Sequence, residues 1–365
     1  MQRGHCGSSR YPPFTAALER RRCRARIPGE VNLRLFQNSS GDVVADKRAG
    51  YAEAAAKDQD FDAAAEVMSQ ALELAPRWTA GWALLGRYRE EAGDLAGAIA
   101  AFEELARLDG EGVFGAGLRL AALGVAPVPE GPEIVYVEAL FDDYAARFEE
   151  ELLHKLSYDA PQRLAALLVR ELEARGLGQV GHAIDLGCGT GLMGERLRRR
   201  VSFLEGVDLS GEMVAMAERK GIYDRLDKAE LTVWLGAHQG GVDLLAAADV
   251  LNYCGELAPI LKQAMRVLEP GGLFALTLER HRGEEAMLLR PSLRYAHNGD
   301  ASRQACREAG FEVLAVEESV LRHDRGEPIE GLLVLLGKPS VGVPVPVAAA
   351  VVGDEDDGAQ GLLDG

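Results

Sequence analysis

Residues 183–191 read Ala-Ile-Asp-Leu-Gly-Cys-Gly-Thr-Gly, an apolar strand end followed by glycines at alternate positions. Glycine has no Cβ, so the backbone at Gly187, Gly189 and Gly191 can adopt positive φ and lie close to a ligand. Residues 192–200 then place apolar side chains on one face of an expected helix. A strand, a glycine loop and a helix in this order form a cradle of backbone N–H groups that suits a nucleotide.

From residue 182 onward, strand and helix patterns alternate, which predicts a doubly wound α/β sheet with crossover helices on both faces. The expected strands are 182–187, 202–208, 230–235, 242–249, 272–279, 311–321 and 330–337. The expected helices between them are 190–200, 211–221, 256–268 and 300–309. Only the short segment 324–328 connects the last two strands, and so short a connection permits only an antiparallel pair.

The composition excludes several classes of protein. A length of 365 residues suggests two or three domains. A net charge of -17 and a pI near 5.0 argue against a nucleic-acid partner, which needs a basic surface. The five cysteines are scattered without a CxxC pair, which favours a reducing, cytoplasmic location. No apolar run reaches the roughly 18 residues of a membrane helix, so no membrane partner is expected.

Three stretches differ in composition from the rest of the chain. Residues 1–43 are rich in arginine and poor in acids, which is typical of transit peptides and of disordered extensions. They show no clean amphipathic period, which favours the disordered extension. Residues 125–135 are rich in proline and predict a linker, and residues 340–365 predict a disordered tail.

Residues 44–124 repeat with a period of 34, because Asp60 recurs as Asp94 and Ala64 as Ala98 (94−60 and 98−64). This period is the length of a tetratricopeptide repeat, and the segment resembles that family over two copies with a truncated third. The second copy carries the family pattern at Trp82, Leu85, Gly86, Ala98, Phe102 and Leu105. Two copies fall below the three that an independent solenoid needs, so the helices are expected to dock on the neighbouring domain.

Two ligands compete for the glycine loop. Residues 189–194 match the GxGxxG pattern of dinucleotide-binding loops, although a single match of this kind is weak. Asp185 stands two residues before the first glycine, where its charge would repel a pyrophosphate and attract an ammonium group. Asp208 ends the next expected strand, where a carboxylate can accept hydrogen bonds from both ribose hydroxyls. An ammonium group and a ribose without a pyrophosphate describe S-adenosylmethionine better than NAD.

Three motifs carry a resemblance to a known family. Asp185-Leu-Gly-Cys-Gly-Thr-Gly, Gly206-Val-Asp-Leu-Ser and Leu268-Glu-Pro-Gly-Gly follow the order and spacing of class I S-adenosylmethionine-dependent methyltransferases, which the chain resembles. More narrowly, residues 45–339 resemble bacterial methyltransferases with an N-terminal tetratricopeptide segment. The resemblance implies a seven-stranded Rossmann-like methyltransferase sheet within residues 136–339, with an antiparallel last strand, preceded by the α-helical tetratricopeptide segment.

The resemblance also implies contacts with S-adenosylmethionine. Asp185 would hold the methionine ammonium group, and Asp208 would bind the ribose hydroxyls, although Asp208 or Ser210 also fits as the N-cap of the next helix. Glu230 stands where the family often places an acid for the adenine amino group. The other residues implied near the cofactor are Tyr144, Gly187, Cys188, Gly189, Gly191, Leu209, Met213 and Asp249.

The candidate catalytic residues are His297 and Tyr253. An imidazole can take a proton from an acceptor near neutral pH, although a lone histidine is more often structural. The sulfonium of the cofactor already activates its methyl group, so the protein mainly has to position both reactants in line. We therefore expect methyl transfer to an O, N or C atom of a small molecule. The seven histidines show no metal-ligand spacing, so no metal site is expected.

Two other functions fit the sequence. The first is an NAD-dependent oxidoreductase that uses residues 189–194, which would place a pyrophosphate beside Asp185. The second is a non-catalytic scaffold that binds S-adenosylmethionine and uses the tetratricopeptide repeats to bind a protein partner.

Overall fold

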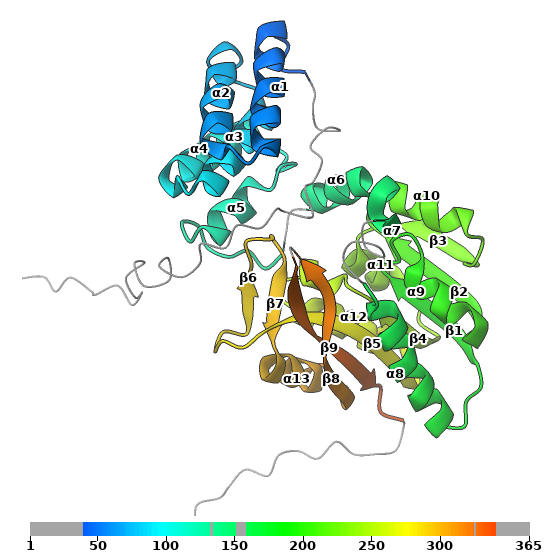
Figure 1. The fold of residues 1–365 in the computed structure, drawn as a ribbon. Coiled ribbons are helices and arrows are strands. Elements are labelled where there is room, and N and C mark those ends of the chain that lie inside the picture. Colours follow the sequence, from blue (N-terminus) through cyan, green and yellow to red (C-terminus); the bar gives the residue numbers. More distant parts are fainter. Residues whose placement is uncertain (1–38, 132–133, 151–157, 325, 341–365) are drawn as a thin grey trace, which may run out of the picture.

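The computed structural model describes residues 39–131, 134–150, 158–324 and 326–340, and Figure 1 shows their arrangement. The extension expected over residues 1–43 and the tail expected over residues 340–365 lie almost wholly outside these ranges. A group of helices comes first in the chain, and a sheet covered by helices follows. Within the described ranges, no helix is long and apolar enough to cross a bilayer.

The first part of the described chain is helical. Its elements are α1 (Val43–Lys57), α2 (Phe61–Leu74), α3 (Thr79–Ala92), α4 (Leu95–Leu108) and α5 (Ala116–Ala122). Asp60 and Asp94 cap the N-termini of α2 and α4, where each carboxylate accepts a hydrogen bond from a backbone N–H. Gly86 of α3 lies so close to the Phe102 ring of α4 that a Cβ would overlap it. The sequence period thus coincides with a repeated helix pair.

The helix α5 joins these helices to the rest of the protein. Leu118 and Ala121 of α5 share one apolar cluster with Leu289, Leu293 and Tyr295 from the sheet part. The Arg119 guanidinium also donates a hydrogen bond to the Pro291 carbonyl oxygen at 3.2 Å. The helices therefore dock on the neighbouring domain, as expected of a repeat segment with too few copies to stand alone.

A mixed sheet forms the second part. Its strands are β1 (Val180–Leu186), β2 (Val201–Asp208), β3 (Arg225–Lys228), β4 (Val242–Ala247), β5 (Leu268–His281), β6 (Met287–Leu289), β7 (Tyr295–Asn298), β8 (Glu312–Asp324) and β9 (Glu327–Gly337). The order is β3-β2-β1-β4-β5, and these strands are parallel. β9 runs antiparallel to both β5 and β8, which confirms the antiparallel pair expected from the short connection.

The described residues form nine strands, so the expected count of seven is wrong. The additional strands are β6 and β7, in a stretch where no strand was expected. β5 extends from Leu268 to His281, beyond the expected range 272–279, and its residues 279–281 pair with β7 beyond the end of its pairing with β4. The greater length of β5 therefore gives it a third partner besides β4 and β9.

The expected strand over residues 230–235 is also wrong, because this stretch lies in α11 (Leu231–Ala237) and the third strand is β3. Leu231, Val233 and Leu235 alternate like a strand, which explains the error. The Glu230 carboxylate accepts hydrogen bonds from two backbone N–H groups in the first turn and so starts a helix. Leu231 and Leu235 are then buried on one helical face, and Val233 is 71% exposed.

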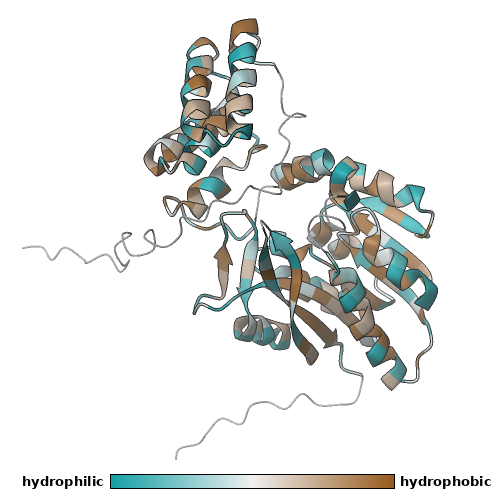
Figure 2. Cartoon of the chain, in the orientation of Figure 1, coloured by the Kyte–Doolittle hydropathy of each residue, from teal (hydrophilic) through white to brown (hydrophobic). Residues whose placement is uncertain are grey.

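Helices cover both faces of the sheet, as expected of a doubly wound fold. α8 (Ala160–Ala174) and α9 (Leu192–Leu197) pack into one apolar cluster. α11, α12 (Ala258–Val267) and α13 (Gly299–Glu308) pack into the other. Figure 2 shows hydrophobic residues concentrated along the central strands between these layers.

One more helical segment lies beside α10 (Gly211–Arg219). It consists of α6 (Ile134–Tyr144), the 3₁₀ turn Ala145–Arg147 and α7 (Phe148–Glu150). α6 begins at Ile134, inside the range 125–135 that was expected to be a linker. The Ser210 hydroxyl donates to the Asp142 carboxylate at 2.5 Å, so α6 is tied to the end of β2.

Candidate functional site

A cavity of about 370 Å³ lies at the carboxyl ends of β1, β2 and β4. This volume is within the usual range of small-molecule sites. Parallel strands bring their carboxyl ends to one edge of the sheet, which is where such folds bind ligands. Most of the residues implied as cofactor contacts line this cavity: Tyr144, Gly187, Gly189, Asp208, Leu209, Met213, Glu230 and Asp249. Asp185, Cys188 and Gly191 lie outside the lining.

The glycine loop needs its glycines for conformation and for space. Gly187, Gly189 and Gly191 have φ values of 62°, 52° and 95°, in the left-handed region that other residues rarely adopt. At Gly187, a Cβ would also overlap the Val250 side chain. Gly194, the last glycine of the GxGxxG match, lies inside α9 against the Tyr223 hydroxyl. The packing of Tyr223 accounts for this glycine without any pyrophosphate.

Asp185 lies behind the loop with an unfilled hydrogen-bonding position. Its side chain is 1% exposed, and its Oδ2 accepts a hydrogen bond from the Tyr223 hydroxyl at 2.6 Å. Its Oδ1 is buried and has no hydrogen-bond partner in the described part of the chain. Burial raises the pKa of Asp185 to about 7, although the Tyr223 hydrogen bond opposes this. A buried carboxylate oxygen of this kind suits a cationic or N–H partner.

Asp208 holds the loop against the end of β2. Its Oδ2 accepts a hydrogen bond from the Gly189 N–H at 2.8 Å, and its Oδ1 accepts one from the Ser210 N–H at 2.9 Å. Ser210, rather than Asp208, caps α10 by accepting from the Met213 N–H. Burial raises the pKa of Asp208 to about 6, although these backbone donors oppose it. Each carboxylate oxygen keeps acceptor capacity for a ligand hydroxyl.

Glu230 and Asp249 line the cavity, but each also has a partner inside the protein. Glu230 caps α11, as described above. Asp249 has a φ of 59°, and its two carboxylate oxygens accept hydrogen bonds from Arg322 at 2.6 and 2.8 Å. Burial raises the pKa of Asp249, and the Arg322 charge opposes this shift.

Sequence reasoning missed a cluster of arginines and carboxylates beside the cavity. Arg322 of β8 is 2% exposed and binds Glu279 of β5 as well as Asp249. Arg290 lies 3.4 Å from Glu279, and Arg294 donates from Nε to the Tyr253 hydroxyl at 2.9 Å. Both Arg294 and Arg322 line the cavity. Glu279 at the end of the buried apolar run of β5 was the available signal, whereas the many polar residues of β8 gave none for Arg322.

The two candidate catalytic residues lie in different surroundings. Tyr253 lines the cavity, whereas His297 does not. His297 is 3% exposed, and its Nε2 lies 3.0 Å from the Gly255 carbonyl oxygen. Burial lowers the pKa of His297, so the ring is neutral and donates to this carbonyl. Cys188 is also buried, which raises the pKa of its thiol well above the usual value.

Outside the cavity, the fold brings together three potential metal ligands that the sequence spacing did not indicate. His182, Glu205 and His238 place one ligand atom each within 4.8 Å of one another. The residues are far apart in the sequence, so no motif links them.

Residues 184–276 match a family model described as a methyltransferase domain. Among curated proteins, a ubiquinone biosynthesis O-methyltransferase of Sodalis glossinidius (strain morsitans) is 28% identical over 153 residues, which is 39% of this chain and 59% of the relative. A trans-aconitate 2-methyltransferase of Delftia acidovorans is 33% identical over 111 residues, which is 30% of this chain and 41% of the relative. The chain thus spans less than two thirds of either relative.

Among solved structures, a S-adenosylmethionine-dependent methyltransferase from Clostridium acetobutylicum aligns with a TM-score of 0.41 and 16% identity, over 53% of this chain and 98% of the other. A magnesium protoporphyrin IX methyltransferase from Synechocystis with bound SAH aligns with a TM-score of 0.39 and 16% identity, over 48% of this chain and 83% of the other.

The family model confirms the predicted methyltransferase domain over residues 184–276. The tetratricopeptide character of α1–α5 and the cytoplasmic location stay predictions.

Proposed function

We propose that this protein transfers the methyl group of S-adenosylmethionine to a small molecule bound in the cavity. One observation carries the proposal. At the carboxyl ends of β1 and β2, the glycine loop and Asp208 line the cavity, and Asp185 behind the loop has a buried oxygen without a hydrogen-bond partner among the described residues. When bound, the cofactor supplies a methyl group that its sulfonium has already activated. The matched methyltransferase domain supports this choice over NAD.

The residues of the loop fit the cofactor. Asp185 offers a buried oxygen without a donor, and Asp208 offers acceptor capacity beside the loop. Gly187 and Gly189 leave the backbone open to a ligand, because neither carries a side chain. We assign the methionine ammonium group to Asp185 and the ribose hydroxyls to Asp208.

The chain contributes positioning and the exclusion of water. Phe141 and Tyr144 from α6 and Phe148 from α7 form an aromatic wall of the cavity. Phe148 packs edge to face against both other rings, at centroid distances of 6.4 and 5.4 Å. These three side chains carry no charge, so the wall favours an apolar part of the ligand. We propose that it encloses the reacting groups and so favours in-line transfer.

We further propose that the acceptor carries an anionic group, such as a carboxylate, which Arg294 binds. Among the described residues, Arg290 and Arg322 of the cluster beside the cavity pair with the carboxylates of Glu279 and Asp249, whereas Arg294 has no carboxylate within 4.0 Å. In the described ranges, no group accepts a hydrogen bond from the terminal nitrogens of Arg294. A guanidinium presents paired N–H donors that match a carboxylate. The relative named for trans-aconitate, a carboxylate, supports this acceptor class.

Calorimetry with S-adenosylmethionine and S-adenosylhomocysteine tests the cofactor assignment, with NADH as the competing ligand. We expect binding of both sulfur compounds at micromolar concentrations and none of NADH. No binding of the sulfur compounds below about millimolar concentration would contradict the proposal.

The acceptor is tested by incubating the protein with methyl-labelled cofactor and a cell extract, separated into protein, RNA and small-molecule fractions. We expect label in an anionic small molecule, and less label with Arg294→Leu although S-adenosylmethionine still binds. Label in a neutral or cationic product would overturn the acceptor class alone. Cofactor binding without transfer to any fraction would favour the non-catalytic scaffold.

We also propose that α1–α5 are tetratricopeptide-type repeats of a cytoplasmic protein. The repeated caps Asp60 and Asp94 and the close contact between Gly86 and Phe102 support this assignment. Because α5 packs against Leu293 and Tyr295, these helices suit a role in supporting the part of the cavity that contains Arg294, or in binding a protein partner.

A further inference from the structure

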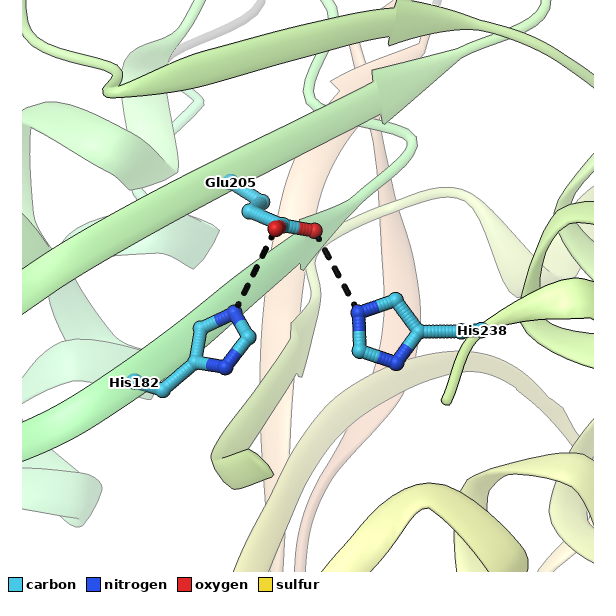
Figure 3. A group of neighbouring side chains, drawn as sticks. All are labelled: His182, Glu205 and His238. Carbon is cyan, nitrogen blue, oxygen red and sulfur yellow. Dashed lines mark ion pairs between the residues drawn. The ribbon is translucent and has the colours of Figure 1, made fainter. Parts of the chain in front are cut away.

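Three side chains converge on one point that the proposed methyl transfer does not use (Figure 3). His182 lies near the start of β1, Glu205 lies on β2, and His238 directly follows α11. The parallel register pairs Ile184 with Glu205, so His182 and Glu205 project from the same face of the sheet. None of the three residues lines the cavity.

The spacing of the polar atoms matches a small tetrahedral cation. His182 Nε2 lies 3.6 Å from Glu205 Oε1, and His238 Nε2 lies 3.4 Å from Glu205 Oε2. Nitrogen and oxygen ligands bind zinc at about 2.0–2.2 Å, which sets tetrahedral ligand atoms about 3.3–3.6 Å apart. Both separations from the Glu205 carboxylate suit ligands of one ion, and the three ligand atoms lie within 4.8 Å of one another.

The carboxylate at the centre accepts no well-aligned hydrogen bond from the described residues, although His238 Nε2 lies 3.4 Å from its Oε2. Glu205 is 4% exposed, and its Oε2 and the His182 Nε2 are both buried without a hydrogen-bond partner among the described residues. Arg225 approaches Oε1 only to 3.8 Å, and its side chain is 54% exposed. A buried carboxylate is strongly unfavourable unless a cation or donor compensates it. A shared cation would satisfy both unpartnered atoms at once.

The two histidine rings differ in which nitrogen carries the proton, and therefore in whether Nε2 is free to bind an ion. His182 Nδ1 lies 3.3 Å from the Gly241 carbonyl oxygen. A proton on Nδ1 donates to this carbonyl and leaves the Nε2 lone pair directed at Glu205, as in histidines that bind metals. His238 Nδ1 instead accepts a hydrogen bond from the Gly240 N–H at 3.0 Å.

Binding at His238 Nε2 therefore moves the ring proton to Nδ1 and turns the Gly240 N–H away. Gly240 and Gly241 have φ values of 93° and 81° and carry no side chains, so this turn can rearrange at little steric cost.

We propose that His182, Glu205 and His238 bind a divalent transition-metal ion of the zinc class. Two imidazoles and one carboxylate form a donor set that suits zinc and its neighbours, whereas magnesium and calcium prefer oxygen ligands. Three protein ligands leave a fourth position for water. The ion ties the C-terminal end of α11 to β1 and β2. α11 begins next to Glu230, which lines the cavity, so the ion stiffens an element that helps to form the cavity wall.

The test is a titration of the full-length, chelator-treated protein with cobalt(II), followed by visible absorption, and with zinc, followed by metal analysis. We expect one ion per chain and the intense visible bands of tetrahedral cobalt. His182→Gln and Glu205→Gln should each weaken binding at least tenfold. His323→Gln is the matched control, because His323 is exposed and distant from the cluster in the sequence, and it should bind as the wild type does.

The chain has seven histidines and five cysteines, so weak binding elsewhere forms a background that all variants share. The double variant of His182 and Glu205 measures this background. Equal binding by the wild type and the double variant overturns the proposal. Circular dichroism of the same metal-free variants checks that they are folded, and this check depends neither on the metal nor on the proposed cofactor.

Discussion

The two ends of the cavity are built in different ways. The end beside the glycine loop is lined by residues close together in the sequence, from Gly187 to Met213, with Asp185 buried behind them. The other end is lined by charged side chains from β8 and from the segment before β7, and Arg322 of β8 is paired with Glu279 of β5. We infer that the first end mainly determines cofactor affinity, whereas the second end couples ligand recognition to the stability of the fold.

The largest expected effect comes from removing Arg322, at the end of the cavity that charged side chains form. Arg322→Met leaves the buried carboxylates of Asp249 and Glu279 without their main partner, so it should lower the free energy of unfolding by about 3–5 kcal/mol. Urea denaturation measures this loss. Arg170→Met is the matched control, because Arg170 pairs with Glu317 at the surface and should contribute at most about 1 kcal/mol. Similar losses for both variants would contradict the comparison.

The next largest effect concerns cofactor affinity at the end of the cavity beside the glycine loop. Asp208→Ala removes an acceptor for the cofactor and for the Gly189 N–H, so we expect S-adenosylmethionine to bind about ten- to a hundredfold more weakly, or about 1.5–3 kcal/mol. Calorimetry measures the affinity, and thermal unfolding should show a smaller loss than Arg322→Met. Unchanged affinity would remove Asp208 from the cofactor site.

The pH dependence of binding gives a third effect. Asp185 and Asp208 have pKa values of about 7 and about 6, and a cationic ammonium group favours ionised Asp185. Affinity for S-adenosylmethionine should therefore fall as the pH is lowered from about 8 to 6, by at most about tenfold per pH unit for one group. Calorimetry across this range measures it, and Asp185→Asn should flatten the curve. A flat curve in the wild type would contradict the assignment.

The stability of the cofactor-free protein should change in the opposite direction. The folded pKa values of Asp185 and Asp208 lie above the ordinary value of 3.8, so the folded state holds protons that the unfolded state releases. Their contribution to stability is present below about pH 4 and is lost as the pH rises through about 6 to 7. Cofactor binding should compensate for part of this loss.

The smallest effect concerns Glu230. If this residue acts mainly as a helix cap, Glu230→Ala should lower the free energy of unfolding by about 1 kcal/mol and change cofactor affinity less than twofold. Glu230→Asp should restore most of the stability. A large loss of affinity without a loss of stability would instead assign Glu230 to the adenine.

The same contrast explains what the sequence could predict. The loop at 187–191 and Asp208 belong to one strand–helix–strand unit, so their spacing in the sequence maps directly onto space. The helix at 231–237 was mistaken for a strand because Leu231 and Leu235 fit both periods, and only the cap at Glu230 decides between them. Arg322 and Glu279 meet across β8, β9 and β5, and no sequence spacing encodes that contact. The cluster of His182, Glu205 and His238 was hidden for the same reason.

The segment before β7 has two faces that serve different neighbours. Leu293 and Tyr295 pack in the cluster with α5, while Arg294 between them lines the cavity. A substitution in these three residues therefore affects both the packing of α5 and the charged end of the cavity. The helices are not an interchangeable module, because the surface that receives them is also the back of the binding site.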